Sequence, residues 1–271
     1  MQRTVFFISD GTGLTAEALG HSLLTQFEKI QFNAITIPYV NDVDKARSVA
    51  HRIDAAYAAE KTKPLVFTTL LNPIIYQIIH ETYSYHVDFF ERFIEPLEKE
   101  LATVSSHTTG KTHGLRSYKN YMKRMNAINY AIANDDGTNT NDYKRADIII
   151  TGVSRSGKTP TCIYLALQYG LYAANYPLTQ EDFITKALPD ALLTYRDKLI
   201  GLTIDPERLQ QIRSERRPNS RYAELENCQY EVAQGLNLFR RFGIRYLNTT
   251  THSIEEIAAE ILSLEKVEKR I

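Results

Sequence analysis

The chain has 271 residues, of which 43% are hydrophobic and 24% charged, and its 32 basic residues balance 32 acidic residues. This composition is ordinary for a globular protein with one large domain or two modest ones. It lacks the basic surplus that partners such as nucleic acid or anionic membranes usually demand. The apolar stretch at the N-terminus is too short for a signal peptide, and no run is long enough to span a bilayer. We therefore expect a cytoplasmic protein with no nucleic-acid and no membrane partner.

The two cysteines, Cys162 and Cys228, form neither a disulfide framework nor a set of zinc ligands. We expect both to be reduced thiols that pack as small hydrophobic side chains.

The first part of the chain alternates between strand-like and helix-like patterns. Short apolar runs predict strands at residues 4–9, 34–38 and 65–70, and apolar residues spaced by three and four predict a helix after each strand. In the first of these helices, Leu19, Leu23 and Phe27 form the expected apolar stripe. Strands that alternate with helices favour parallel pairing, so this part predicts a layered α/β domain.

Polar residues interrupt this alternation twice. Residues 103–116 are rich in Ser, Thr, His, Gly and Lys, which predicts an exposed loop or a linker. A helix is expected over residues 118–134, and a second polar break follows from Asp135 to Asn141.

The last part of the chain restarts the alternation. Strands are expected at residues 146–151, 171–176, 199–204 and 244–247, with helices at 160–169, after Asp205-Pro206 and after Ser253. We therefore predict two domains. Residues 1–140 form the N-terminal α/β domain, and residues 141–271 form a P-loop, kinase-like nucleotide-binding domain with a mainly parallel sheet.

The strongest chemical signal is a glycine-rich segment between a predicted strand and a predicted helix. Its residues are Gly152, Val153, Ser154, Arg155, Ser156, Gly157, Lys158 and Thr159. Glycines permit a loop whose amides turn toward a phosphate, and the N-terminus of the following helix attracts the same anion. In this pattern the lysine reaches the terminal phosphates and the threonine offers its hydroxyl to Mg²⁺. The segment therefore predicts a phosphate loop.

Arginines near this segment give a second, weaker signal. Arg155 lies inside the loop, and Arg213, Arg216, Arg217 and Arg221 cluster further along. A mobile segment carrying arginines could close over the transferring phosphate. A solvated basic helix face explains the same cluster equally well.

Several acidic residues are candidates for holding Mg²⁺ or for accepting a proton from an acceptor hydroxyl. Asp135 and Asp136 lie beside Gly137, where they could equally make a turn. Asp182 and Asp205 are alternatives, and Asp205 is our candidate for a metal ligand because it follows a predicted strand. The same position suits a plain helix cap.

The turn at residues 9–13, Ser-Asp-Gly-Thr-Gly, also follows a strand and precedes a helix. It could be a second anion-binding or substrate-binding turn, because ligand crevices lie at the carboxyl ends of parallel strands. A purely structural glycine turn is equally consistent with it.

Seven segments together carry a resemblance to a known family. In chain order they are FISDGT (7–12), PLVF (64–67), DDG (135–137), GVSRSGKTPT (152–161), AANYP (173–177), GLTIDPERL (201–209) and NSRYA (219–223). With these segments the chain resembles, over essentially its whole length, the bacterial kinase–pyrophosphorylase family that regulates phosphoenolpyruvate synthase. A related branch acts on pyruvate, phosphate dikinase, and residues 156–157 and 173–177 look closer to the synthase-directed branch.

This resemblance implies two opposing reactions on one protein substrate. Family members use ADP to phosphorylate a threonine of phosphoenolpyruvate synthase, which inactivates it. They reverse the modification with inorganic phosphate and release pyrophosphate. For this chain we therefore expect ADP, Mg²⁺ and inorganic phosphate as ligands and phosphoenolpyruvate synthase as the partner. We expect a homodimer only because closed two-fold assemblies are the commonest kind.

On this hypothesis, Lys158 and Arg155 hold the transferring phosphate and Thr159 holds Mg²⁺, with Asp205 as a second metal ligand. Asp135 or Asp136 positions the acceptor hydroxyl; the sequence does not choose between them. Two other functions are compatible with the same phosphate loop. One is a kinase for a small metabolite or nucleotide, and the other is a regulator that binds nucleotide without transferring phosphate.

Overall fold

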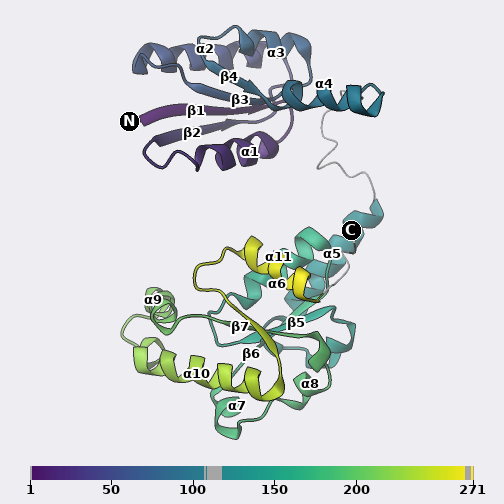
Figure 1. Ribbon diagram of the computed structural model, residues 1–271, viewed down its shortest axis with the longest axis vertical. Helices are drawn as coiled ribbons and strands as arrows, with labels where there is room; N and C mark the ends of the chain where they lie inside the picture. Colours follow the sequence, from purple (N-terminus) through teal and green to yellow (C-terminus); the bar gives the residue numbers. More distant parts are fainter. Residues whose placement is uncertain (1, 107, 109–117, 266–269, 271) are drawn as a thin grey trace. The chain divides into compact units, whose positions relative to one another are not determined.

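The computed structural model describes residues 2–106, 108, 118–265 and 270. The chain divides into two compact units, Met1–Arg116 and Ser117–Ile271, each built on its own four-stranded sheet (Figure 1). The strand pairs of both sheets are parallel. The prediction of two α/β domains with parallel strands is therefore confirmed.

The first unit has the strand order β2-β1-β3-β4. Its elements are β1 (Gln2–Ser9), α1 (Leu14–Leu24), β2 (Gln31–Ile37), α2 (Val43–Glu60), β3 (Leu65–Thr69), α3 (Pro73–His80), β4 (Tyr85–Asp88) and α4 (Phe89–Leu101). Helix α1 covers one face of the sheet, and α2 and α3 cover the other (Figure 1). The pair β4 and α4 was not predicted from the sequence.

The prediction that Leu19, Leu23 and Phe27 form the packed stripe of the first helix was wrong, and Phe27 lies beyond the end of α1. Leu19, Leu23 and Phe27 are 45%, 50% and 56% exposed, whereas Ala16, Gly20 and Leu24 face the sheet. A Cβ atom on Gly20 would lie 2.3 Å from a ring carbon of Phe7. The side of α1 that carries Ala16 and Gly20 therefore packs against the sheet, because a glycine at position 20 leaves room for the Phe7 ring.

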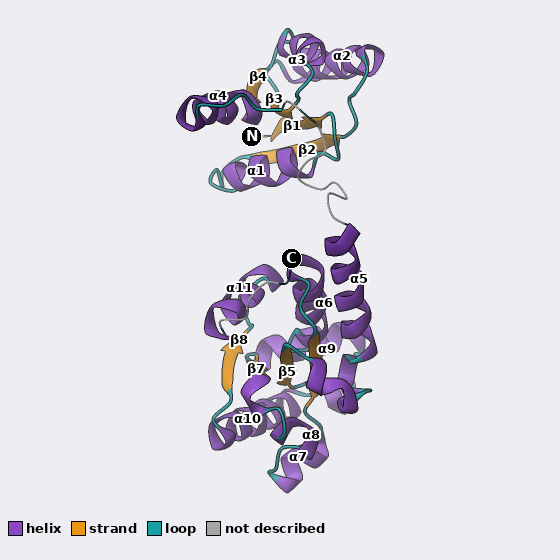
Figure 2. Cartoon of the chain, turned by 90° about the vertical axis from the view of Figure 1, so that its right-hand side faces the viewer, coloured by secondary structure: helices purple, strands orange, loops and turns teal. Residues whose placement is uncertain are grey.

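The second unit has the strand order β6-β5-β7-β8. Its helices and strands are α5 (Tyr118–Ala133), β5 (Ile148–Gly152), α6 (Lys158–Tyr169), β6 (Ala173–Pro177), α7 (Gln180–Thr185), α8 (Asp190–Leu193), β7 (Leu199–Thr203), α9 (Pro206–Arg216), α10 (Leu225–Phe242), β8 (Arg245–Asn248) and α11 (Ile254–Glu265). Short 3₁₀ helices are η1 (Asp135–Gly137), η2 (Thr140–Arg145), η3 (Arg196–Lys198) and η4 (Arg221–Ala223). Residues of α5, α6 and α11 share one core against the sheet, and these helices lie together in Figure 2.

The division between the units falls earlier than the predicted boundary between residues 140 and 141. Helix α5 packs on α6, and its Ala127 and Ala131 are buried in the core of the second unit. Tyr143 of η2 is fully buried in the other core of the same unit. Residues 118–140 therefore belong to the second unit, because their apolar side chains complete its cores. The predicted linker at 103–116 lies largely outside the described residues.

Candidate functional site

The predicted phosphate loop connects a central strand to a helix. Strand β5 lies between β6 and β7, and its last residue, Gly152, approaches the neighbouring strand so closely that a Cβ atom there would lie 2.3 Å from the carbonyl oxygen of Leu202. Gly157, with a φ of +91°, has open space where a Cβ atom would be, and helix α6 begins after it without a side-chain cap. The amides at this helix start are thus available to an anion.

Lys158 lies inside the loop. Its side chain is 4% exposed, and its ammonium group donates a hydrogen bond of 3.0 Å to the carbonyl oxygen of Val153. Burial lowers the pKa of Lys158 to about 8, although the nearby charges of Asp136 and Asp135 oppose this shift. The ammonium group donates to a neutral carbonyl oxygen, so a bound phosphate would place a negatively charged acceptor beside it.

The structure brings Asp135 to the phosphate loop. The Thr159 hydroxyl donates a hydrogen bond of 2.8 Å to Asp135 Oδ1, and the Asn175 amide donates to the same oxygen. Asp136 has a φ of +48°, and its backbone N–H donates to Asn175 Oδ1 at 3.0 Å. Residues from η1, α6 and β6 therefore meet at one point, directly after the loop.

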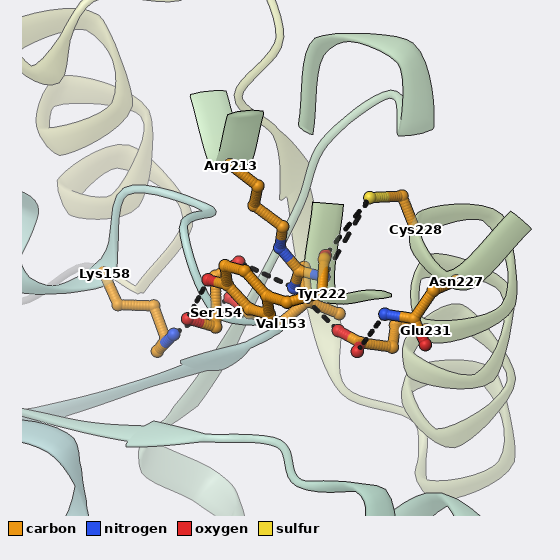
Figure 3. A network of polar contacts seen from close by, with 8 residues as sticks. All are labelled: Val153, Ser154, Lys158, Arg213, Tyr222, Asn227, Cys228 and Glu231. Carbon is orange, nitrogen blue, oxygen red and sulfur yellow. Dashed lines mark hydrogen bonds and ion pairs between the residues drawn. The ribbon is translucent and has the colours of Figure 1, made fainter. Parts of the chain in front are cut away.

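Arg213 also contacts the loop, through the backbone of Ser154 (Figure 3). Its guanidinium group is fully buried, donates to the carbonyl oxygen of Ser154 at 3.0 Å and forms an ion pair of 2.7 Å with Glu231. It also donates to the carbonyl oxygen of Tyr222 at 3.1 Å and lies over that ring. The Tyr222 hydroxyl in turn lies 2.9 Å from Ser154 Oγ. Arg213 is therefore committed to protein groups and is not part of a mobile arginine lid.

The other predicted arginines differ from Arg213. Arg216, Arg217 and Arg221 are exposed. Arg155 is half-buried within the loop and has a φ of +77°, in the left-handed region that non-glycine residues adopt infrequently. Of the predicted arginines, Arg155 is therefore the one that belongs to the loop itself.

The rival carboxylates have structural partners of their own. Asp205 is exposed and accepts a hydrogen bond of 3.0 Å from the Asn248 side chain. Asp182 forms a capping box with Thr179 at the start of α7. Of the four predicted carboxylates, Asp135 is the one whose hydrogen bonds reach the phosphate loop.

The turn at residues 9–13 lies in the first unit, at the carboxyl end of β1. Ser9 is 5% exposed; its hydroxyl accepts from the Thr69 hydroxyl and from the Gly11 N–H, both at 3.0 Å. Asp10 accepts from the N–H of Leu71 at 2.9 Å. The bonds from Thr69 and Leu71 tie the turn to the end of β3 and to the segment that follows it.

Three residues of the site were not found from the sequence. Asn175, Tyr222 and Glu231 lie far along the chain from the groups they contact. Asn175 carried a readable signal, because a polar residue in the middle of a short buried strand requires hydrogen-bond partners. Glu231 carried none, because it lies on an otherwise ordinary helix.

Two features are absent from the part of the chain that the structure describes. It contains no group of three or more His, Cys, Asp or Glu side chains suited to a metal ion. It also contains no helix with the length and apolar character needed to cross a membrane.

Comparison with known proteins extends these observations to the whole chain. The profile of the kinase/pyrophosphorylase family matches residues 5–262. The chain is 52% identical to proteins from Ectopseudomonas mendocina (strain ymp) and Hahella chejuensis (strain KCTC 2396) over 271 residues, covering 100% of both chains in each comparison. A protein from Legionella pneumophila (strain Lens) is equally similar over the same length. These relatives are named phosphoenolpyruvate synthase regulatory proteins. The chain thus belongs to the kinase/pyrophosphorylase family.

Proposed function

We propose that this protein regulates phosphoenolpyruvate synthase by two opposing phosphoryl transfers. In the first, the β-phosphoryl group of ADP moves to a threonine hydroxyl of the synthase, and AMP and a proton leave. In the second, inorganic phosphate accepts that group from the phosphothreonine, giving free threonine and pyrophosphate. The first reaction inactivates the synthase, and the second restores it.

One observation carries this proposal: a buried lysine and a carboxylate meet at a phosphate loop in a chain that matches regulators of the synthase over its full length. ADP and pyrophosphate both contain a diphosphate group. The same loop can hold either one, so a single site serves both directions. Catalysis then comes mainly from positioning and from neutralising charge.

The residues of the loop have distinct roles in this proposal. The amides at the start of α6 and the Lys158 ammonium hold the diphosphate, and Arg155 neutralises charge on the transferring group. Lys158 gives up its bond to the Val153 carbonyl and turns to the phosphate. Because a nearby anion favours the charged amine, binding raises the lowered pKa of this lysine again.

The Thr159 hydroxyl is suited to Mg²⁺. Its hydrogen is directed to Asp135, which leaves its oxygen lone pairs for a cation. Few protein ligands are needed, because Mg²⁺ at such sites binds mainly phosphate oxygens and water. When bound, the ion would neutralise part of the charge on the phosphates. Asp205 as a second ligand remains a prediction, and its bond to Asn248 does not favour it.

We propose that Asp135, and not Asp136, is the carboxylate that positions the hydroxyl of the acceptor threonine. Asp135 is held by Thr159 and Asn175 beside the loop, so its carboxylate has a fixed position relative to the transferring group. It orients the threonine hydroxyl of the synthase and accepts its proton as the new P–O bond forms. In the second reaction Asp135 accepts the proton that inorganic phosphate gives up as it attacks, and passes it to the leaving threonine oxygen.

The direct test incubates the purified protein with phosphoenolpyruvate synthase, Mg²⁺ and either ADP or ATP. We expect threonine phosphorylation and loss of synthase activity with ADP, and recovery with phosphate accompanied by pyrophosphate release. If a competent synthase stays unmodified while a small acceptor is phosphorylated, the protein is a metabolite kinase. If ADP binds and nothing is transferred, it is a nucleotide-binding regulator. Both results contradict the proposal.

A further inference from the structure

Helix α4 presents an apolar face that the first unit leaves largely uncovered. Phe93, Leu97 and Leu101 are spaced by four residues, so they lie on one side of the helix, and they are 61%, 55% and 64% exposed. Only Phe89 of this helix is buried. An amphipathic helix ordinarily buries its apolar side against other elements. Such an exposed face indicates a surface that another molecule covers.

A cavity of about 310 Å³ lies between α3 and α4, on a part of α4 that does not include Phe93, Leu97 or Leu101. We call it the α3–α4 groove. Its apolar lining consists of Leu70, Leu71, Pro73, Phe90 and Ile94. Tyr76 also lines it, and its hydroxyl donates a hydrogen bond of 2.8 Å to Glu91.

Carboxylates complete the lining of the groove. They come from Asp88, Glu91, Glu95 and Glu98, and none of the described residues that line the cavity is basic. Lys99 forms an ion pair of 2.7 Å with Glu95, and both side chains are well exposed. From residue 88 to residue 101 the chain carries five carboxylates and two basic side chains. The groove is therefore negative around an apolar interior.

This combination complements a long basic side chain. Lysine and arginine pack their methylene stems on apolar surface while the charged end reaches polar groups. Asp88 is 5% exposed at the base of the groove, where its carboxylate accepts hydrogen bonds from the Thr68 hydroxyl and the Glu91 N–H. The exposed Glu91 and Glu95 are therefore the carboxylates that a basic side chain would meet first. A second copy of this chain is a poor occupant, because a two-fold contact would bring the same carboxylates together.

We propose that the α3–α4 groove docks a lysine- or arginine-bearing segment of the protein substrate, phosphoenolpyruvate synthase. This inference rests on the proposed function. The groove would provide a second contact with the protein substrate, separate from the site where the phosphoryl group is transferred. The first unit holds the synthase through charge and apolar contact, while the second unit carries the phosphate loop. Tethering in one chain raises the effective concentration of the acceptor threonine near that loop.

The test compares two charge reversals on the same helix in the full-length protein. Glu95→Lys changes the lining of the groove, whereas Glu100→Lys makes the same change in net charge at an exposed residue outside it. Binding to purified phosphoenolpyruvate synthase is measured by titration calorimetry at about 50 and 300 mM salt. ADP affinity and the KM for the synthase are measured in parallel.

We expect Glu95→Lys to weaken synthase binding and raise the KM for the synthase about tenfold, because like charges now face each other. ADP affinity should be unchanged, and Glu100→Lys should alter binding less than about twofold at the higher salt. Wild-type binding should weaken as salt rises.

Equal effects of the two variants, or no effect of either, would overturn docking in the groove while leaving the transfer reactions intact. A change in oligomeric state by light scattering, with synthase binding preserved, would assign the groove to a second copy. If Glu95→Lys alters only the thermal unfolding of the chain, Glu95 acts through its pair with Lys99 within α4, and docking in the groove is overturned. A wild-type protein that neither binds nor phosphorylates the synthase fails at the level of the proposed function itself.

Discussion

The buried pair formed by Arg213 and Glu231 allows a quantitative prediction. Arg213 is completely buried, and the side chain of Glu231 is 21% exposed. Removing the carboxylate by Glu231→Ala leaves a buried cation that still donates to the carbonyl oxygens of Ser154 and Tyr222 and, at 3.9 Å, to the Cys228 sulfur. Breaking a buried pair in this way costs about 3–5 kcal/mol. We expect about 3 kcal/mol, because Glu231 is partly solvated and two carbonyls still accept from the guanidinium.

The converse change, Arg213→Met, removes the cation but leaves a carboxylate that water can reach. It also leaves the carbonyl oxygens of Ser154 and Tyr222 without this donor, at a cost of about 1–3 kcal/mol. In the double variant no charge is stranded. Its destabilisation should therefore fall short of the sum of the single values by about 1.5 kcal/mol or more.

The assay is unfolding in urea. It is monitored by the hydrogen exchange of peptides from α9 and α10, so that the stability of the second unit is measured by itself. Arg216→Met is the matched control, since Arg216 is exposed on the same helix and should change stability by less than about 0.5 kcal/mol. ADP affinity should fall in Arg213→Met because Ser154 is released. Strictly additive single and double values would refute the reasoning, and so would an Arg216→Met effect equal to that of Arg213→Met.

The remaining predictions concern the loop, its carboxylate and the packing of α1. Lys158→Met should abolish ADP binding by calorimetry without loss of secondary structure; retained binding would remove the lysine from the phosphate site. Burial lowers the pKa of Lys158 from its usual 10.5 to about 8, so the folded ligand-free protein binds fewer protons than the unfolded chain between these pH values. Its stability should therefore rise as pH increases from about 8 to about 10, relative to Lys158→Met. ADP affinity should fall over the same range because binding requires the charged amine, and a flat pH profile would contradict this. Asp135→Asn should reduce kcat by about 10²–10⁴-fold with little change in ADP affinity, while Asp136→Asn should retain most activity; the opposite order would exchange their roles. Gly20→Leu should destabilise the first unit by more than about 2 kcal/mol in thermal unfolding because of the Phe7 ring, whereas Leu19→Ala on the exposed side should be nearly neutral.

Features set by neighbouring residues could be predicted from the sequence. The glycine pattern of residues 152–159 predicts a loop between an apolar strand and a helix, and the structure has this strand and helix at Ile148–Gly152 and Lys158–Tyr169. That this loop binds phosphate stays a prediction. Helix α5 was predicted within one residue of its observed end at Ala133. Helix α10 was missed although its buried residues Cys228, Val232 and Phe239 have helical spacing.

Features set by contacts between distant residues could not be predicted. The apolar residues of α1 show a periodic face, but the missing side chain of Gly20 decides which side meets the sheet. The meeting of Asp135 with Thr159 and Asn175 depends on how α5 packs against α6 and β6. The sequence does not distinguish Arg213 from Arg216 and Arg217, which are exposed. The burial of Arg213 follows from the positions of α9 and α10.

The packing of α5 also determines which fragment of the chain keeps the glycine loop, Asp135 and the hydrophobic cores together. A fragment that begins at residue 141 contains the whole glycine loop, yet it lacks Asp135 and would expose the apolar surface of α6 that Ala127 and Ala131 cover. A fragment that begins at residue 118 keeps the loop, the carboxylate and both cores together. A gene fusion or recombination made before residue 118 would therefore exchange the first unit while keeping the residues of the proposed transfer site together in one folded unit.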